Sequence, residues 1–141
     1  MPYREKIAWL SLLAMALTFT PYFVITAGEH PASEALPNLR QLWLYGIAAV
    51  ARVAILGIGW LALRLGARED ARMPMDERDR AIAGRAATWG YGVLMAGMIL
   101  TGVVMPFTSN GWTIVNAALA MIVAAEVVRY GAVVLSYRRH A

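Results

Sequence analysis

Two charged side chains lie where the sequence is otherwise apolar enough to be inside a lipid bilayer. Arg52 is the only charge in the 22 residues Leu42–Leu63, and Glu126 lies within the apolar segment Trp112–Leu135. A cation at mid-membrane depth costs at least about 2.5–3.5 kcal/mol on insertion scales, so it usually has a partner or a function. A carboxylate beside an arginine in such surroundings is the minimum needed to bind a proton or an anion.

The segment around Glu126 also holds Asn116, Arg129 and Tyr130. Arg129 is three residues after Glu126 and Tyr130 is four after it, so these three share one face of a helix. Counted from the tryptophan near the start of each segment, Arg52 is 9 residues in and Glu126 is 14. Glu126 then lies roughly 7–8 Å deeper, a gap that a long arginine side chain or a helix tilt can close. An Arg52–Glu126 pair and a Glu126–Arg129 pair both remain open.

Small residues beside these polar groups predict that the two segments pack together. Alanines surround Arg52, and three more lie near Asn116. Small residues at such spacing favour contact between helices in lipid. The packing would bury Arg52, Asn116 and Glu126 in one polar seam. The seam has two interpretations, a buried ion pair that fixes helix register and a ligand or proton site.

Four apolar segments are long enough to cross the hydrocarbon core, which needs about 20 helical residues. Helix is the only plausible state for each, because an isolated strand would leave its backbone groups unpaired in lipid. The sequence therefore predicts an all-α integral membrane bundle of four transmembrane helices, forming one domain over residues 1–141. The predicted helices cover about 7–27, 42–63, 76–107 and 112–135, the third including a cytoplasmic extension.

Basic residues predict the orientation. Ten of the 13 Lys and Arg residues flank the spans on one side, at the two termini and between the second and third spans. The last loop, Thr108–Gly111, has no charge, and the first loop has only Arg40, opposed by two glutamates. By the positive-inside rule, this is a multi-pass inner (cytoplasmic) membrane protein with both termini inside. In an alternative interpretation the first span is a cleaved signal peptide, which would leave three spans in the same orientation.

A charged cluster precedes the third span; its residues are Asp76, Glu77, Arg78, Asp79 and Arg80. Asp76 is a good N-cap, and acids in the first turn interact favourably with the helix dipole. We expect a helix of about 30 residues, about 45 Å long, whose first turns protrude into the cytoplasm. The cluster is either a solvated helix start with orientation signals or a docking surface for a cytoplasmic protein partner.

The sequence DERDRAI entering a membrane helix, with the closing segment AEVVRYGAVVLSYRRHA, resembles a family of small uncharacterised prokaryotic membrane proteins with four helices. The resemblance covers about Asp76–His140, and the first half matches in hydropathy and spacing alone. It implies the fold and the topology but no chemistry. Such proteins are often encoded beside small helix-turn-helix regulators, which implies regulation or immunity rather than metabolism. Arg52 lies outside the resembling region.

The composition excludes several kinds of site. The chain has no cysteine and only two histidines, His30 and His140, which are predicted on opposite sides of the membrane. We therefore expect no metal site and no cofactor. The net charge of +4 is accounted for by topology signals, so no nucleic-acid partner is expected. The sequence has no nucleophile–base pair and no phosphate-binding loop, which makes an enzyme the least favoured class.

The sequence favours a non-enzymatic membrane protein with a regulatory or protein-interaction role. The alternative is a small transporter or channel that uses Arg52 and Glu126 as an intramembrane proton or anion site. Because four helices rarely enclose a pathway alone, that alternative needs a homodimer or a larger oligomer. The expected partners are thus the lipid bilayer, a cytoplasmic protein and a second copy of the chain.

Overall fold

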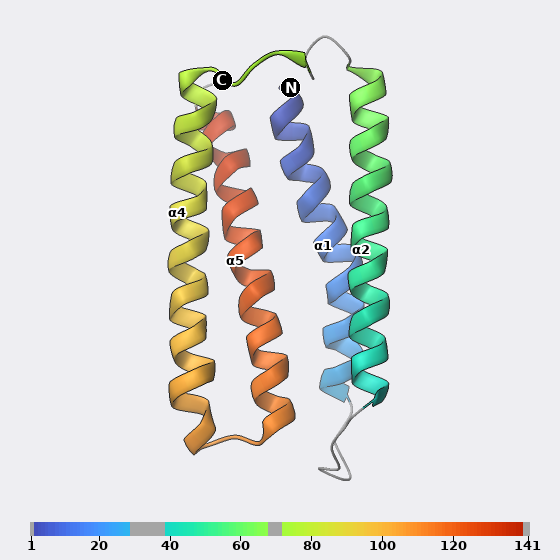
Figure 1. The fold of residues 1–141 in the computed structure, drawn as a ribbon, viewed down its shortest axis with the longest axis vertical. Helices are drawn as coiled ribbons and strands as arrows, with labels where there is room; N and C mark the ends of the chain where they lie inside the picture. The colour runs from blue at the N-terminus through green and yellow to red at the C-terminus, as the bar shows by residue number, and fades with distance from the viewer. Residues whose placement is uncertain (1, 29–38, 68–71, 140–141) are drawn as a thin grey trace.

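The computed structural model describes residues 2–28, 39–67 and 72–139, and within these ranges all regular structure is helical. Each long helix runs antiparallel to its neighbour (Figure 1). Each is long and apolar enough to cross a membrane, so the predicted all-α fold with four spans is confirmed. The bounds are α1 Tyr3–Gly28, α2 Leu39–Gly66, α4 Glu77–Ile99 and α5 Gly111–Arg139.

The helices form two hairpins, α1–α2 and α4–α5, which meet where α1 packs against α5 (Figure 1). One end of the bundle, the terminal end, holds the start of α1 and the last turn of α5. The predicted close packing of the second and fourth spans is wrong, because α2 packs against α1 instead. Ala48, one of the alanines near Arg52, lies in a cluster with Met15, Phe19 and Tyr22 of α1. Side chains of α2, Arg52 among them, reach α5.

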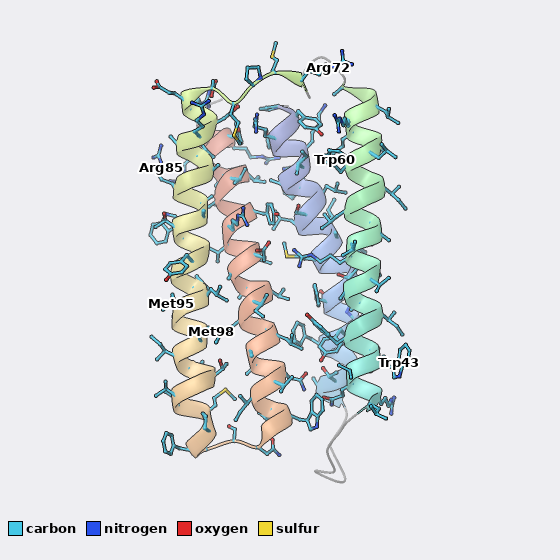
Figure 2. All side chains as sticks on the ribbon, viewed as in Figure 1. Trp43, Trp60, Arg72, Arg85, Met95 and Met98 are labelled. Carbon is cyan, nitrogen blue, oxygen red and sulfur yellow. The ribbon has the colours of Figure 1, made fainter. Side chains whose placement is uncertain are left out.

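The core of the bundle follows α1, which has a packed helix on each side. Its buried residues recur every three or four positions from Glu5 to Thr26, and Ala14 and Met15 are 0% and 1% exposed. The outward faces of α2 and α4 are apolar but exposed, as Trp43 and Met98 illustrate in Figure 2. Apolar surface of this kind suits contact with lipid.

The predicted start of the third helix is confirmed. Asp76 is the N-cap of α4, and its side-chain oxygen accepts a hydrogen bond of 2.7 Å from the backbone N–H of Asp79. This bond satisfies one of the N–H groups that a helix start leaves without an intrahelical partner. The polar first loop, whose sequence EHPASEALPN is long enough to form a small cap, covers residues 29–38, which lie outside the described residues.

Two prolines have different effects on their helices. Beyond Ile99 the third span continues through a π-helical turn, Leu100–Val104, and a 3-10 turn, Met105–Phe107. Pro106 lacks the N–H that a continuing α-helix needs, so the span ends here. Pro21 lies inside α1, where a proline can kink or end a helix, but α1 continues past it to Gly28.

Two glycines allow α4 to approach α5 closely. A Cβ added at Gly97 would lie 2.6 Å from the Cβ of Met121, and one at Gly90 would lie 3.1 Å from a backbone oxygen of α5. Gly92 and Gly102 have nothing within 4 Å of an added Cβ. Of these four glycines, Gly90 and Gly97 are therefore the packing positions within the bundle.

Gly97→Ala should lower the thermal unfolding midpoint of the purified protein in detergent, whereas Gly92→Ala should leave it unchanged or raise it. The added methyl group at Gly97 overlaps Met121, and overpacking of this kind costs about 1–3 kcal/mol. The methyl group at Gly92 meets open space, and alanine favours a helix by about 0.5–1 kcal/mol. Equal midpoints for the two variants would contradict the glycine contact.

Candidate functional site

Arg52 of α2 and Glu126 of α5 form an ion pair across the bundle. The guanidinium Nη2 lies 3.4 Å from Oε2 of Glu126, and the side chains are 21% and 28% exposed. The guanidinium carbon lies 5.8 Å from the centre of the Phe19 ring on α1, within the range of a cation–π contact. The backbones of α2 and α5 do not pack closely together, so this ion pair joins them through long side chains.

Glu126 also faces a second guanidinium. Nη1 of Arg129 lies 3.8 Å from Oε1 of Glu126, one turn along the same helix. The two pairings that the sequence left open as alternatives therefore occur together. The side chain of Arg129 is 49% exposed, and its guanidinium lies 5.6 Å from the ring centre of Tyr130. One carboxylate between two guanidinium groups gives this cluster a surplus positive charge.

Asn116 belongs to a different polar group, which lies toward the end of the bundle opposite the terminal end (Figure 1). The Tyr22 hydroxyl donates a hydrogen bond of 2.8 Å to Oδ1 of Asn116, and Nδ2 of Asn116 donates one of 3.2 Å to Oε1 of Gln41. Asn116 is ten residues before Glu126, a rise of about 15 Å. The predicted single seam is therefore two separate groups, each joining α2 to α5.

Sequence reasoning missed two members of the group around Asn116. The sequence puts Tyr22 near the end of its span, away from Arg52 and Glu126, and nothing in the spacing connected Tyr22 or Gln41 with Asn116. Both are only 4% exposed. An uncharged amide or hydroxyl that is buried needs a hydrogen-bond partner. Like Asn116, each lies near the end of its helix that is opposite the terminal end, and this shared depth is the signal in the sequence that could have grouped them.

The terminal end holds a third polar group, which joins α1, α4 and α5. Nε of Arg4 lies 2.9 Å from Oδ2 of Asp79, and the Tyr137 hydroxyl donates a hydrogen bond to Oδ1 of Asp79. Beside it, Nε of Arg138 lies 3.6 Å from Oε1 of the buried Glu5. Two helices are thus tied to the first turn of α4 through one carboxylate.

The charged cluster that precedes the third span is divided between two roles. Asp76 caps the helix and Asp79 bonds inward, whereas Glu77, Arg78 and Arg80 are exposed. No group of three or more potential metal ligands occurs in the described ranges. Both histidines lie outside those ranges.

A family model for a predicted membrane protein, DUF2178, matches residues 7–141. The chain belongs to the DUF2178 family. The DUF2178 match extends beyond the resembling region Asp76–His140 and includes Arg52. That the Asp76–Arg80 cluster and the Tyr137–Arg139 ending are marks of DUF2178 stays a prediction. No curated protein and no solved structure matches the chain.

In this DUF2178 protein, Glu126→Gln should destabilise the bundle more than Arg52→Gln does. Without Glu126, both guanidinium groups lose their carboxylate, whereas without Arg52 the carboxylate keeps Arg129. Removing one partner of a fully buried pair costs about 3–5 kcal/mol, and we expect about 1–2 kcal/mol for these mostly but not fully buried side chains.

Thermal unfolding in detergent of the two single variants and of the double variant measures the coupling between Arg52 and Glu126. We expect the double variant to be more stable than the sum of the two single effects. Strictly additive effects would mean that the two side chains do not interact.

Proposed function

We propose that this protein is a non-enzymatic membrane protein with a regulatory or protein-interaction role. The observation that carries the proposal is the first turn of α4. Asp76 caps the helix and Asp79 bonds inward, so together they fix the helix start and leave Glu77, Arg78 and Arg80 exposed beside it. A fixed charged surface binds a partner at lower entropic cost than a mobile one.

The terminal end faces the cytoplasm in this proposal. Most basic residues of the described chain lie there, including Arg72 and Arg85, whereas the turn between α4 and α5 has no charge (Figure 2). Under the positive-inside rule this distribution supports an inner-membrane protein with both termini inside. The exposed surface of α4 then meets cytoplasmic proteins.

A photo-cross-linking amino acid at position 78 should form an adduct with a cytoplasmic protein in living cells. The same amino acid at position 91 is the matched control, because Tyr91 is exposed on the apolar part of the same helix. The double charge reversal Glu77→Lys with Arg80→Glu should abolish the adduct without lowering the unfolding midpoint, since both residues are exposed.

Adducts of equal yield from positions 78 and 91 would contradict a specific partner. So would an adduct that survives charge reversal, because the proposed recognition depends on those charges. A lowered midpoint in the reversed variant would instead assign the exposed charges to stability.

The second candidate function is an oligomeric small transporter or channel. The surplus positive charge of Arg52, Glu126 and Arg129 favours this role. Nε of Arg52 is buried without a hydrogen-bond partner among the described residues, so it is a donor that a bound anion can use. The pathway would lie between copies of the chain, since one copy holds its four helices as two adjoining hairpins.

In the transporter case, proteoliposomes containing the protein should conduct protons or chloride faster than empty vesicles. Glu126→Gln should reduce the proton flux to that of empty vesicles, and Arg52→Gln should do the same for chloride. Arg64→Gln is the control, because Arg64 lies in the last turn of α2, away from the pair and over the Trp60 ring. Flux that is unchanged in both site variants would rule out this role for the pair.

A further inference from the structure

A pocket with two arginines lies between α4 and α5, near the terminal end. Its volume is about 370 Å³, and it is lined by Arg78, Ala81, Ile82 and Arg85 of α4 and by Ser136 of α5. The α4 residues recur every three or four positions, so they share one face of that helix. Figure 2 shows Arg85 on the outer side of α4. The charged and hydroxyl groups of the pocket, two guanidinium groups and one O–H, are all hydrogen-bond donors.

The two arginines of this pocket are not neutralised by the described residues. Within the described ranges, neither guanidinium has an ion pair or a hydrogen bond. The nearest carboxylates have other partners, since Asp76 accepts the cap hydrogen bond and Asp79 pairs with Arg4. Glu77 is next to Arg78 in the sequence, and adjacent residues of a helix do not face each other. The pocket therefore presents two positive charges to whatever occupies it.

The pocket lies at the depth of the lipid headgroups. Phe107 ends the third span and is 86% exposed. A hydrocarbon core of about 30 Å takes about 20 helical residues, so counting back from Phe107 places its other boundary near Trp89. The Trp89 side chain is 68% exposed, as expected of an aromatic residue at a membrane interface. Arg85 is one turn beyond Trp89 toward the terminal end, and Arg78 is about 10 Å farther along the same face.

We propose that this pocket binds the phosphate of an anionic phospholipid from the leaflet at the terminal end. Arginine binds phosphate oxygens through charge-assisted hydrogen bonds, and the Ser136 hydroxyl is a third donor. Two cations exceed the charge of one phosphate, which favours a lipid with net negative charge over a zwitterionic one. From a phosphate in the pocket, the acyl chains pass Trp89 into the hydrocarbon core, which is the orientation of the surrounding lipids. Because lipid surrounds the protein at high concentration, a modest affinity fills the site.

Native mass spectrometry of the full-length protein in detergent, titrated with dioleoyl phosphatidylglycerol and dioleoyl phosphatidylcholine, tests this site. The wild type should bind the anionic lipid at least about fivefold more tightly, as expected for basic side chains at a membrane surface. Arg85→Gln should remove most of this preference, and Ser136→Ala should weaken binding of both lipids. Arg64→Gln is the matched control, because it removes one cation from the last turn of α2, outside the pocket. It should bind both lipids as the wild type does.

Ala81→Phe gives an independent test, because it fills the pocket without changing any charge. It should weaken binding of both lipids, and its unfolding midpoint reports whether the bundle is intact. The proposal is overturned if Arg85→Gln and Arg64→Gln lower the preference equally, which would assign it to the general charge of this end. It is equally overturned if the wild type has no preference, or if inorganic phosphate displaces phosphatidylglycerol at equal concentration, which would assign the pocket to a soluble phosphate. The protein partner of the proposed function is tested at Glu77 and Arg80, so either proposal can fail alone.

Discussion

Glu126 is the carboxylate on which two intramembrane arginines depend. A guanidinium without a counter-charge is costly within a membrane span. In the described structure Arg52 and Arg129 both form ion pairs with Glu126. This shared carboxylate also sets the position of α2 relative to α5, because no close backbone packing holds those two helices together. Phe19 of α1 completes the arrangement by placing an aromatic ring near the Arg52 guanidinium.

The remaining contacts that hold the bundle together are an apolar core, a close helix contact and polar groups. α1 supplies the apolar core along its whole length, and α4 meets α5 through Gly90 and Gly97. Polar groups appear at three levels, near the loops, in the middle and at the terminal end, and each one joins helices from both hairpins. In a membrane, where helix association gains little from the hydrophobic effect, such directed contacts set which helices are neighbours.

The number of spans and the start of α4 could be predicted from the sequence because each rests on local information. Hydropathy over about 20 residues identifies a span, and Asp76 is recognisable as a cap from its own short segment. The neighbours of each helix could not be predicted this way. Alanine-rich faces permit contact with any helix, so Ala48 packs on α1 rather than on α5.

The reach of long side chains was predictable only in part. The depth difference between Arg52 and Glu126 allowed the ion pair, and the structure contains it. The hydrogen bond from Tyr22 to Asn116 was not predictable, because depth counted in residues does not tell which helix packs beside Asn116. Distances across a bundle depend on helix packing, which the spacing of residues within one helix does not contain.

Close packing and long side chains hold different pairs of helices together. In α4–α5, an added Cβ at Gly90 would meet a backbone oxygen at 3.1 Å, and in α1–α2 one at Gly59 would lie 2.6 Å from Leu10, so the helices within each hairpin cannot slide or rotate without a steric clash. α2 is joined to α5 by side chains with several rotatable bonds, and these tolerate changes of tilt between the hairpins. A change in the ionic partner of Arg52 would therefore act on the contact between α2 and α5, while α2 keeps its packing against α1.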